Sequence, residues 1–315
     1  MDFVGNALAP NVLLIKRHLA DLSAKQRRSG KPKLDYCFPR RGEKDARSAL
    51  VLDTRSCIGL QAGFGFAPFL DDESRAEIFG NSSSFVAAYP KSASRLFERS
   101  GLLGPFPLTV YSVSPFVMMV DRAALGPASL PRRWEDLLDA RFEGKIVTTA
   151  EDSASNVAML SFYALFGPEG ARMLFNNIAR TVSASVMPSL AKQGDCGASV
   201  FIIPWFFARC CTAGERIVMV WPEEGAFSFP LWLALRKGAP EGSRVISSFF
   251  TGDDFARECA RACLPAVNAA SDGELDATCR DLHWVGWDYL ENLDTSAYAS
   301  FVDSLVVADG ETNAR

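Results

Sequence analysis

The chain has 315 residues, with 33 Lys and Arg against 37 Asp and Glu, which gives a net charge of −4 at pH 7. This slight acidic excess excludes a general nucleic-acid binder, because neutralising phosphates takes a basic surplus. An apolar fraction of 48% with 22% charged residues is typical of a globular protein with a real core. The length fits about two domains. The longest apolar stretch, 199–207, contains Pro204 and is far shorter than the roughly 20 residues that span a bilayer, so no membrane span is predicted.

The cysteines and histidines predict neither a disulfide scaffold nor a zinc centre. None of the eight cysteines lies in a CxxC pair, and only His18 and His283 are present, so no zinc site of standard spacing can be drawn. We therefore predict no metal and no cofactor. The first 20 residues lack the charged start, apolar run and cleavage site of a signal peptide. As written, the chain is expected to be cytoplasmic; a chain trimmed of its leader would read the same, and the periplasm is the alternative.

In chain order, the pattern predicts an amphipathic basic helix and a polar connector over the first 48 residues or so. Short apolar runs that predict strands lie at 50–52, 84–88, 114–120, 145–149, 199–203, 217–221 and 230–235. A Pro followed by acids predicts a helix start at 131–138. Helical spacing over 153–166 resumes over 169–179, after a Gly-Pro pair. Apolar strands separated by helices predict an α/β class with largely parallel sheets.

The segment 148–156 follows a predicted strand and opens a predicted helix. In open α/β sheets, ligands bind beyond the carboxyl ends of strands, and the free N–H groups of a helix start attract anions. The candidate ligand residues here are Glu151, Asp152, Ser153, Ser155 and Asn156. The alternative is that a polar residue at this point only caps the helix.

A second candidate is the loop 221–226, which places an indole and two carboxylates directly after a strand. Acids beside an aromatic face can hold an organic cation. The candidate residues are Trp221, Glu223, Glu224 and Gly225. The alternative is a solvated acidic turn.

Two weaker candidates complete the set. Pro204 and Trp205 end an apolar strand and are expected to line a pocket or, alternatively, to belong to an aromatic core cluster. Ser82 and Ser83 offer hydroxyls before a strand, with a plain turn as the alternative. The chain contains no GxSxG, HExxH, GxxxxGK[ST] or GxGxxG motif. We therefore expect a binding protein rather than an enzyme.

Several of these segments, taken in order, resemble the extracellular solute-binding proteins of ABC transporters, in the group that includes iron, polyamine and aminophosphonate binders. Residues 130–138 (LPRRWEDLL) and 142–146 (FEGKI) are similar to the family pattern P-x-x-W-x-D-L-L followed by G-K-I. Segments 151–156, 202–208, 221–226 and 282–290 are similar to later parts of the pattern. Iron-binding members carry adjacent tyrosines where this chain has Trp205, Phe206 and Phe207, which makes ferric iron doubtful. Residues 36–41 (YCFPRR) look like a segment of leaderless relatives, with Cys37 as a functional thiol or an incidental core cysteine.

The resemblance implies a two-lobed, type II periplasmic-binding-protein fold with two mixed or parallel sheets, flanking helices and a hinge. It predicts an amino-terminal helix and connector at 1–33, lobe one at 34–115 plus 236–315, and lobe two at 116–235. The crossover strands are expected near 112–120 and 226–235. The implied partners are a small molecule in the cleft between the lobes and an ABC-transporter permease, with no nucleic acid.

The function predicted from the sequence is the binding of a small polar or amine-bearing solute by closure of the two lobes. The alternative is a cytosolic enzyme or ligand sensor on the same fold, because a fold does not determine a function.

Overall fold

The computed structural model describes residues 1–38, 51–149, 156–194, 196–211 and 214–312. The chain divides into two compact units: unit 1 comprises Met1–Val113 and Phe229–Asp276, and unit 2 comprises Ser114–Ser228 and Ala277–Arg315. Of the three internal boundaries, the first two fall inside long strands, β5 (Leu108–Asp121) and β10 (Ala226–Arg236), and the third falls between Asp276 and Ala277. The division differs from the predicted lobes at the two ends of the chain, because residues 1–33 belong to unit 1 and residues 277–315 to unit 2.

Unit 1 contains a mixed sheet. Its strands are β1 (Phe3–Gly5), β2 (Tyr36–Cys37), β3 (Leu60–Phe64), β4 (Phe85–Val86), the start of β5 and the later part of β10. β1 lies between β2 and β3 and is parallel to both. β10 is antiparallel to β3 and, at its end, to β4. The predicted strand at 50–52 is not a strand at residues 51 and 52, and residue 50 lies outside the described ranges.

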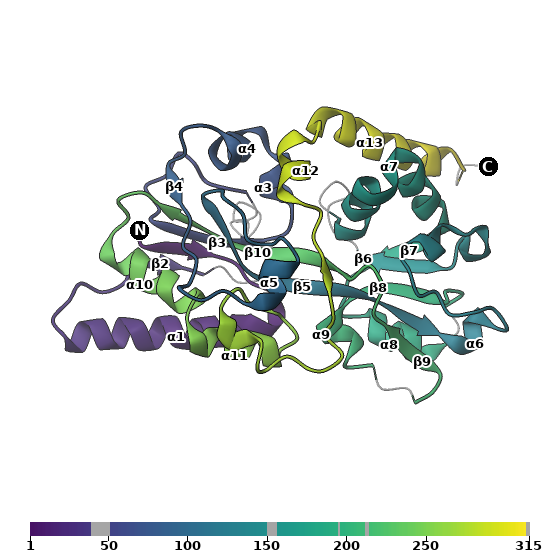
Figure 1. Ribbon diagram of the computed structural model, residues 1–315, viewed down its shortest axis with the longest axis horizontal. Helices are drawn as coiled ribbons and strands as arrows, with labels where there is room; N and C mark the ends of the chain where they lie inside the picture. Colours follow the sequence, from purple (N-terminus) through teal and green to yellow (C-terminus); the bar gives the residue numbers. More distant parts are fainter. Residues whose placement is uncertain (39–50, 150–155, 195, 212–213, 313–315) are drawn as a thin grey trace. The chain divides into compact units, whose positions relative to one another are not determined.

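The helices of unit 1 are α1 (Ala9–Arg28), α3 (Ala67–Leu70), α4 (Asp72–Phe79), α5 (Arg95–Arg99), α10 (Glu241–Phe250) and α11 (Asp253–Arg261). The expected amino-terminal helix is α1, which starts with a Pro in its first turn and buries Asn11, Ile15, Leu19 and Ser23, four residues apart, on one face. Figure 1 shows α1 beside α10 and α11, where the His18 ring stacks on Phe249 with their centroids 3.6 Å apart.

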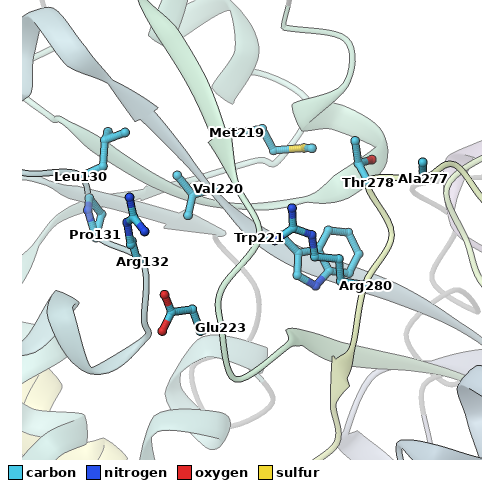
Figure 2. Close-up of a pocket in the computed structure, with 10 residues that line it drawn as sticks. All are labelled: Leu130, Pro131, Arg132, Met219, Val220, Trp221, Glu223, Ala277, Thr278 and Arg280. Carbon is cyan, nitrogen blue, oxygen red and sulfur yellow. The ribbon is translucent and has the colours of Figure 1, made fainter.

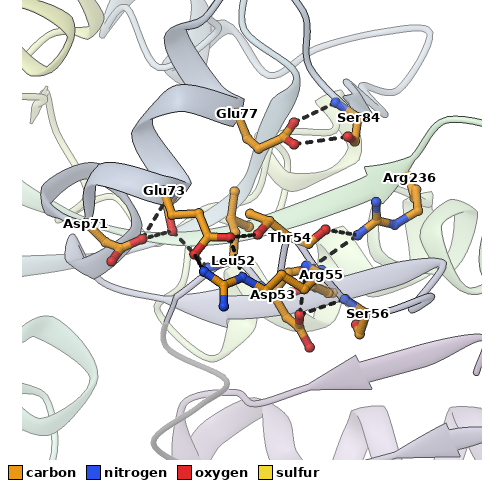
Figure 3. A network of polar contacts seen from close by, with 12 residues as sticks. Leu52, Asp53, Thr54, Arg55, Ser56, Asp71, Glu73, Glu77, Ser84 and Arg236 are labelled. Atoms are coloured by element: carbon orange, nitrogen blue, oxygen red, sulfur yellow. Dashed lines mark hydrogen bonds and ion pairs between the residues drawn. The ribbon is translucent and has the colours of Figure 1, made fainter.

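A polar network fixes the loop 52–56 of unit 1 (Figure 3). The Asp53 carboxylate accepts hydrogen bonds from the backbone N–H of Arg55 and Ser56, at 3.2 and 2.9 Å. Arg236 at the end of β10 donates to the carbonyl oxygens of Asp53 and Thr54, at 3.3 and 3.2 Å. Desolvation opposes ionisation of Asp53, but the hydrogen bonds from Ser56 and Arg55 outweigh it and lower its pKa. The loop is therefore held to the end of β10 by hydrogen bonds from the Arg236 side chain to its backbone carbonyl oxygens.

Unit 2 also contains a mixed sheet. Its strands are the end of β5, β6 (Ile146–Thr149), β7 (Ile178–Val182), β8 (Val200–Pro204), β9 (Ile217–Val220), the start of β10, and β11 (Leu282–His283). β6 is parallel to β7 and β8, whereas β8 and β9 are antiparallel to β5. β11 is parallel to the first residues of β10. The strands expected at 114–120, 145–149, 199–203 and 217–221 correspond to β5, β6, β8 and β9.

The helices of unit 2 are α6 (Arg122–Leu125), α7 (Val157–Asn177), α8 (Met187–Gln193), α9 (Trp205–Ala208), α12 (Trp287–Asn292) and α13 (Thr295–Thr312). The predicted break at Gly167-Pro168 is present inside α7, where Gly167 has a non-helical φ of 69°. The expected helix at 131–138 is a short 3-10 turn, η1 (Glu135–Leu138). Figure 1 shows α13 lying along α7, and the rings of Tyr163 and Tyr298 meet there at 4.9 Å.

Candidate functional site

The junction of β6 and α7 in unit 2 is the first predicted ligand segment. Asn156 is the N-cap of α7: its Oδ1 accepts hydrogen bonds from the N–H of Ala158 and Met159, at 3.0 and 3.3 Å. Its Nδ2 donates to the carbonyl oxygen of Thr149 at 2.9 Å. Both the oxygen and the nitrogen of this buried amide therefore form hydrogen bonds, which join the end of β6 to the start of α7. The other predicted residues here, Glu151, Asp152, Ser153 and Ser155, lie outside the described residues.

Two buried threonine hydroxyls at the end of β6 differ from the Asn156 amide in their hydrogen bonding. Thr148 and Thr149 are each 2% exposed. Neither Oγ1 has a hydrogen-bond partner among the residues that the structure describes. Burying a hydroxyl without a partner costs about 1–3 kcal/mol, so these groups are candidates to meet a ligand. The sequence analysis included both threonines in the segment but did not single them out, because each reads as an ordinary strand residue.

The acidic loop after β9 is tied to the segment 132–136 of the same unit. One Glu224 oxygen accepts from Arg133 Nε at 3.2 Å, and the other accepts from the backbone N–H of Trp134 at 3.2 Å. The Glu224 side chain is only 20% exposed. Its hydrogen bond to Arg133 raises the pKa of that guanidinium. Glu224 thus already has a cationic partner from its own chain.

Trp134 contacts the same loop and the strand that follows it. Its indole N–H donates to the carbonyl oxygen of Gly225 at 2.9 Å, and its ring stacks on Phe227 with a centroid separation of 3.9 Å. Asp136 accepts from the backbone N–H of Arg132 and Arg133, at 2.7 and 3.0 Å. Trp134 of the LPRRWEDLL segment therefore fixes the loop 221–225 directly, and Asp136 fixes the backbone of the segment that contacts this loop.

The predicted aromatic walls come together within unit 2. Trp205, fully buried directly after Pro204 and β8, meets the Trp221 ring edge-to-face at 5.3 Å. Trp221 donates its indole N–H to the carbonyl oxygen of Asp281 at 2.8 Å. His283 on β11 packs against Phe227 at 5.7 Å. Burial lowers the pKa of His283, although the charge of Glu224 acts in the opposite direction.

A cavity of about 410 Å³ opens beside this loop, entirely within unit 2 (Figure 2). The predicted residues Trp221 and Glu223 line it, and Glu224 and Gly225 are not among the lining residues. The remaining lining residues are Leu130, Pro131, Arg132, Met219, Val220, Ala277, Thr278 and Arg280. Arg132 and Arg280 were missed from the sequence, because nothing local distinguishes them from other surface arginines.

Ser82 and Ser83 belong to unit 1 and precede β4. Ser82 is exposed, and Ser83 accepts a hydrogen bond from the N–H of Phe85 at 3.0 Å. The neighbouring Ser84 is bound through its N–H and hydroxyl to Glu77, at 2.5 and 3.0 Å (Figure 3). These contacts give the serine segment a role in starting the strand.

Within the described ranges, no group of three or more His, Cys, Asp and Glu side chains is placed to hold a metal ion. None of the eight cysteines, all of which the structure describes, forms a disulfide. Cys37 lies half-buried in β2. Among the helices that the structure describes, none combines the length and apolar character needed to cross a membrane.

Comparison with protein families decides the identity at the family level. The model of the bacterial extracellular solute-binding proteins matches residues 63–293, which is well over half of the chain. The chain belongs to this family. The resemblance stated from the sequence is thereby confirmed. No curated protein sequence matches this solute-binding protein.

Solved structures confirm the two-lobed periplasmic-binding-protein fold. The Trichodesmium protein IdiA (FutA), solved with iron and citrate, has a TM-score of 0.64 at 13% identity and covers 96% of this chain and 98% of its own. The Bordetella ferric binding protein has a TM-score of 0.63 at 14% identity, with coverages of 96% and 98%. AfuA from Actinobacillus pleuropneumoniae, with fructose-6-phosphate bound, has a TM-score of 0.60 at 14% identity and covers 96% of each chain. At these identities the likeness shows the fold and leaves the ligand of this solute-binding protein open.

The family and these neighbours are binding proteins, in agreement with the expected class. The family description is extracellular, so the predicted cytoplasmic location receives no support from the comparisons. The compartment of this solute-binding protein stays a prediction.

Proposed function

We propose that this protein is the solute-binding component of an ABC transporter, and that it carries a small polar solute to a membrane permease. The family match over residues 63–293 supports the transport role. Closure of the two lobes over the solute, as implied by the resemblance, is part of the proposal, because ligand contacts that favour a closed state drive such a motion.

The observation that carries the polar character of the solute is the buried hydroxyl of Thr149, which has no hydrogen-bond partner among the described residues. Thr149 is the last residue of β6 and precedes the predicted ligand residues Glu151, Asp152, Ser153 and Ser155, whereas the side chain of Thr148 points to the opposite face of the sheet. A solute oxygen or nitrogen that bonds to the Thr149 hydroxyl would remove its desolvation cost. The solute is therefore proposed to present a hydroxyl or oxyanion group at this end of the sheet.

The amine-bearing character of the solute depends on the loop 221–225. Because Glu224 is engaged by Arg133 and Trp134, we assign the cation contact to Glu223, whose exposed side chain lines the cavity. Trp221 is proposed as the aromatic wall; Trp205, which is 0% exposed and does not line the cavity, belongs to the aromatic core behind Trp221, as the alternative interpretation of the sequence has it. Ferric iron is not the proposed solute, since Trp205, Phe206 and Phe207 stand where iron binders of the family carry adjacent tyrosines.

The test is thermal unfolding of the purified, reduced protein against amines, amino acids, sugar phosphates, carboxylates, oxyanions and metal ions. A true solute at 100 times its Kd adds about 2.7 kcal/mol to the free energy of unfolding, and Tm rises accordingly. A chemically coherent set of hits is expected. If no compound raises Tm in protein that has been freed of carried-over ligand, the proposed solute-binding function is contradicted.

The site is tested by Thr149→Val, which removes the hydroxyl and keeps the shape. The Kd of the best hit is expected to rise at least tenfold, because a buried hydrogen bond to the solute is lost. Thr181→Val, at an exposed position of β7, is the matched control and should leave the Kd within twofold. Equal effects of both changes would remove Thr149 from the site.

A further inference from the structure

Two arginines that line the cavity of unit 2 differ from neighbouring arginines in their ion pairing. Arg133 and Arg216 are each paired with a carboxylate, Glu224 at 3.2 Å and Asp121 at 2.6 Å. Arg132 and Arg280 line the cavity and are exposed. Neither guanidinium has an ion-pair partner in the part of the chain that the structure describes. Their positive charge is therefore available to a ligand.

The arginines are carried by segments whose backbones are held in place. The N–H of Arg132 donates to Asp136, and its carbonyl oxygen accepts from the N–H of Glu223 at 3.0 Å. Next to Arg280, the carbonyl oxygen of Asp281 accepts from the Trp221 indole and from the N–H of Ala226, at 2.8 and 3.0 Å. Figure 2 shows Arg132 and Arg280 on opposite sides of Val220. A held backbone lowers the entropy cost of using these side chains for binding.

The wall between the arginines is apolar and partly aromatic. Leu130, Met219 and Val220 contribute aliphatic surface, and Trp221 contributes an indole whose orientation is fixed by its hydrogen bond to Asp281. Glu223 is the one carboxylate among the lining residues, so the two guanidinium groups leave a positive excess. Flat apolar surface beside planar, doubly donating guanidinium groups suits an oxyanion attached to a flat organic body.

We infer that this cavity binds the anionic end of an organic solute, a carboxylate or phosphate group on a flat apolar body, through Arg132 and Arg280. The inference goes beyond the solute contact proposed at the end of β6, since neither Thr148 nor Thr149 is among the residues that line this cavity. It adds two specificity-determining residues. With an amine on Glu223, the solute would be a zwitterion.

The experiment titrates the full chain with phenyl phosphate and with benzoate by calorimetry in low-salt buffer, and with benzylamine as the cationic counterpart. Phenyl phosphate is expected to bind more tightly than benzylamine, and its Kd is expected to rise at least tenfold in Arg132→Met and in Arg280→Met. The Kd should also rise with added salt, because exposed charges are screened. Arg180→Met, an exposed arginine of β7 away from the cavity, is the control and should stay within twofold. Thermal unfolding of each variant confirms that it is folded.

Three outcomes overturn the inference: no binding of either anion by folded protein at about 10 mM probe, which is about tenfold above a Kd of 1 mM; tighter binding of benzylamine; or unchanged affinity in both arginine variants. These results leave the proposed function standing if the solute panel still yields coherent hits that depend on Thr149. A flat panel together with arginine-dependent binding of phenyl phosphate would instead contradict the transport role and retain the anion site.

Discussion

At Gly225 the backbone conformation and the available space both require glycine. Its φ is +99°, a region that side chains rarely adopt, and a Cβ there would lie 2.8 Å from the carbonyl carbon of Leu282 and 2.9 Å from the carbonyl oxygen of Asp281. The same residue accepts the indole hydrogen bond of Trp134. The sequence marks Gly225 only as the end of a loop, whereas the close approach of β11 explains why no other residue fits.

Gly225→Ala is expected to lower the free energy of unfolding by about 3 kcal/mol or more, since backbone strain and a backbone clash add together. The control is Gly144→Ala, because Gly144 also has a positive φ, +62°, but has open space around its Cβ position. Its expected cost is about 1 kcal/mol, from conformation only. Urea unfolding measures both variants. Equal losses would show that the approach of β11 does not restrict this position.

At the scale of the element, α7 shows what a local pattern predicts well. The helical spacing on both sides of Gly167-Pro168 predicts two helical runs and a break, and the structure has a 21-residue helix with non-helical backbone at Gly167. The sequence left two interpretations of the polar residues at the start of this helix, a helix cap or a ligand contact. The side-chain bonds of Asn156 to Ala158, Met159 and Thr149 give the cap a structural basis.

Asn156→Ala is expected to lower the free energy of unfolding by about 2 kcal/mol, because a helix cap is lost together with a buried hydrogen bond to Thr149. Asn176→Ala, an exposed asparagine of the same helix, should change it by less than about 0.5 kcal/mol. Chemical denaturation followed by circular dichroism makes the comparison. If Asn156→Ala is as stable as Asn176→Ala and only solute affinity falls, the cap assignment is wrong.

At the scale of the whole molecule, the two compact units are built from discontinuous pieces of chain. The carboxyl-terminal residues 277–315 belong to unit 2, whereas the resemblance assigns them to lobe one. Two contacts within unit 2 account for this: β11 pairs with the start of β10, and α13 packs on α7 through Tyr298 and Phe301, whose rings lie 4.9 and 5.0 Å from that of Tyr163.

Tyr298→Ala is expected to destabilise unit 2 by about 3–5 kcal/mol, since an aromatic side chain that is 1% exposed leaves a cavity. Hydrogen exchange should accelerate over α7 and remain unchanged over α1 of unit 1, because exchange reports local opening. Asp303→Ala, at an exposed position of α13, is the control. Faster exchange in both helices would contradict the assignment of α13 to a separately opening unit.

Much of the fold was predictable because strand and helix signals are local. The apolar runs that became β5, β6, β8 and β9 alternate with helical patterns, and that order defines an α/β class. The segment 131–138 was predicted to start a helix, because a Pro and acids that open a helix also fit a 3-10 turn, in which Asp136 accepts hydrogen bonds from the N–H groups of Arg132 and Arg133. The candidate site was predictable only as segments, because which side chains face a cavity depends on distant parts of the chain.

The composition class, the order of most elements and the family follow from the amino-acid sequence, since each depends on covalent order and short-range periodicity. How the site residues are used follows from three-dimensional packing. Packing engages Glu224 with Arg133, gives Asn156 to the helix cap, and places Arg132 and Arg280 around a cavity with Trp221, where neither has an ion-pair partner among the residues that the structure describes. The pairing and the desolvation of a side chain depend on the residues that pack beside it. Residues 132, 224 and 280 are far apart in the sequence and lie in the same region of unit 2 only in the folded chain.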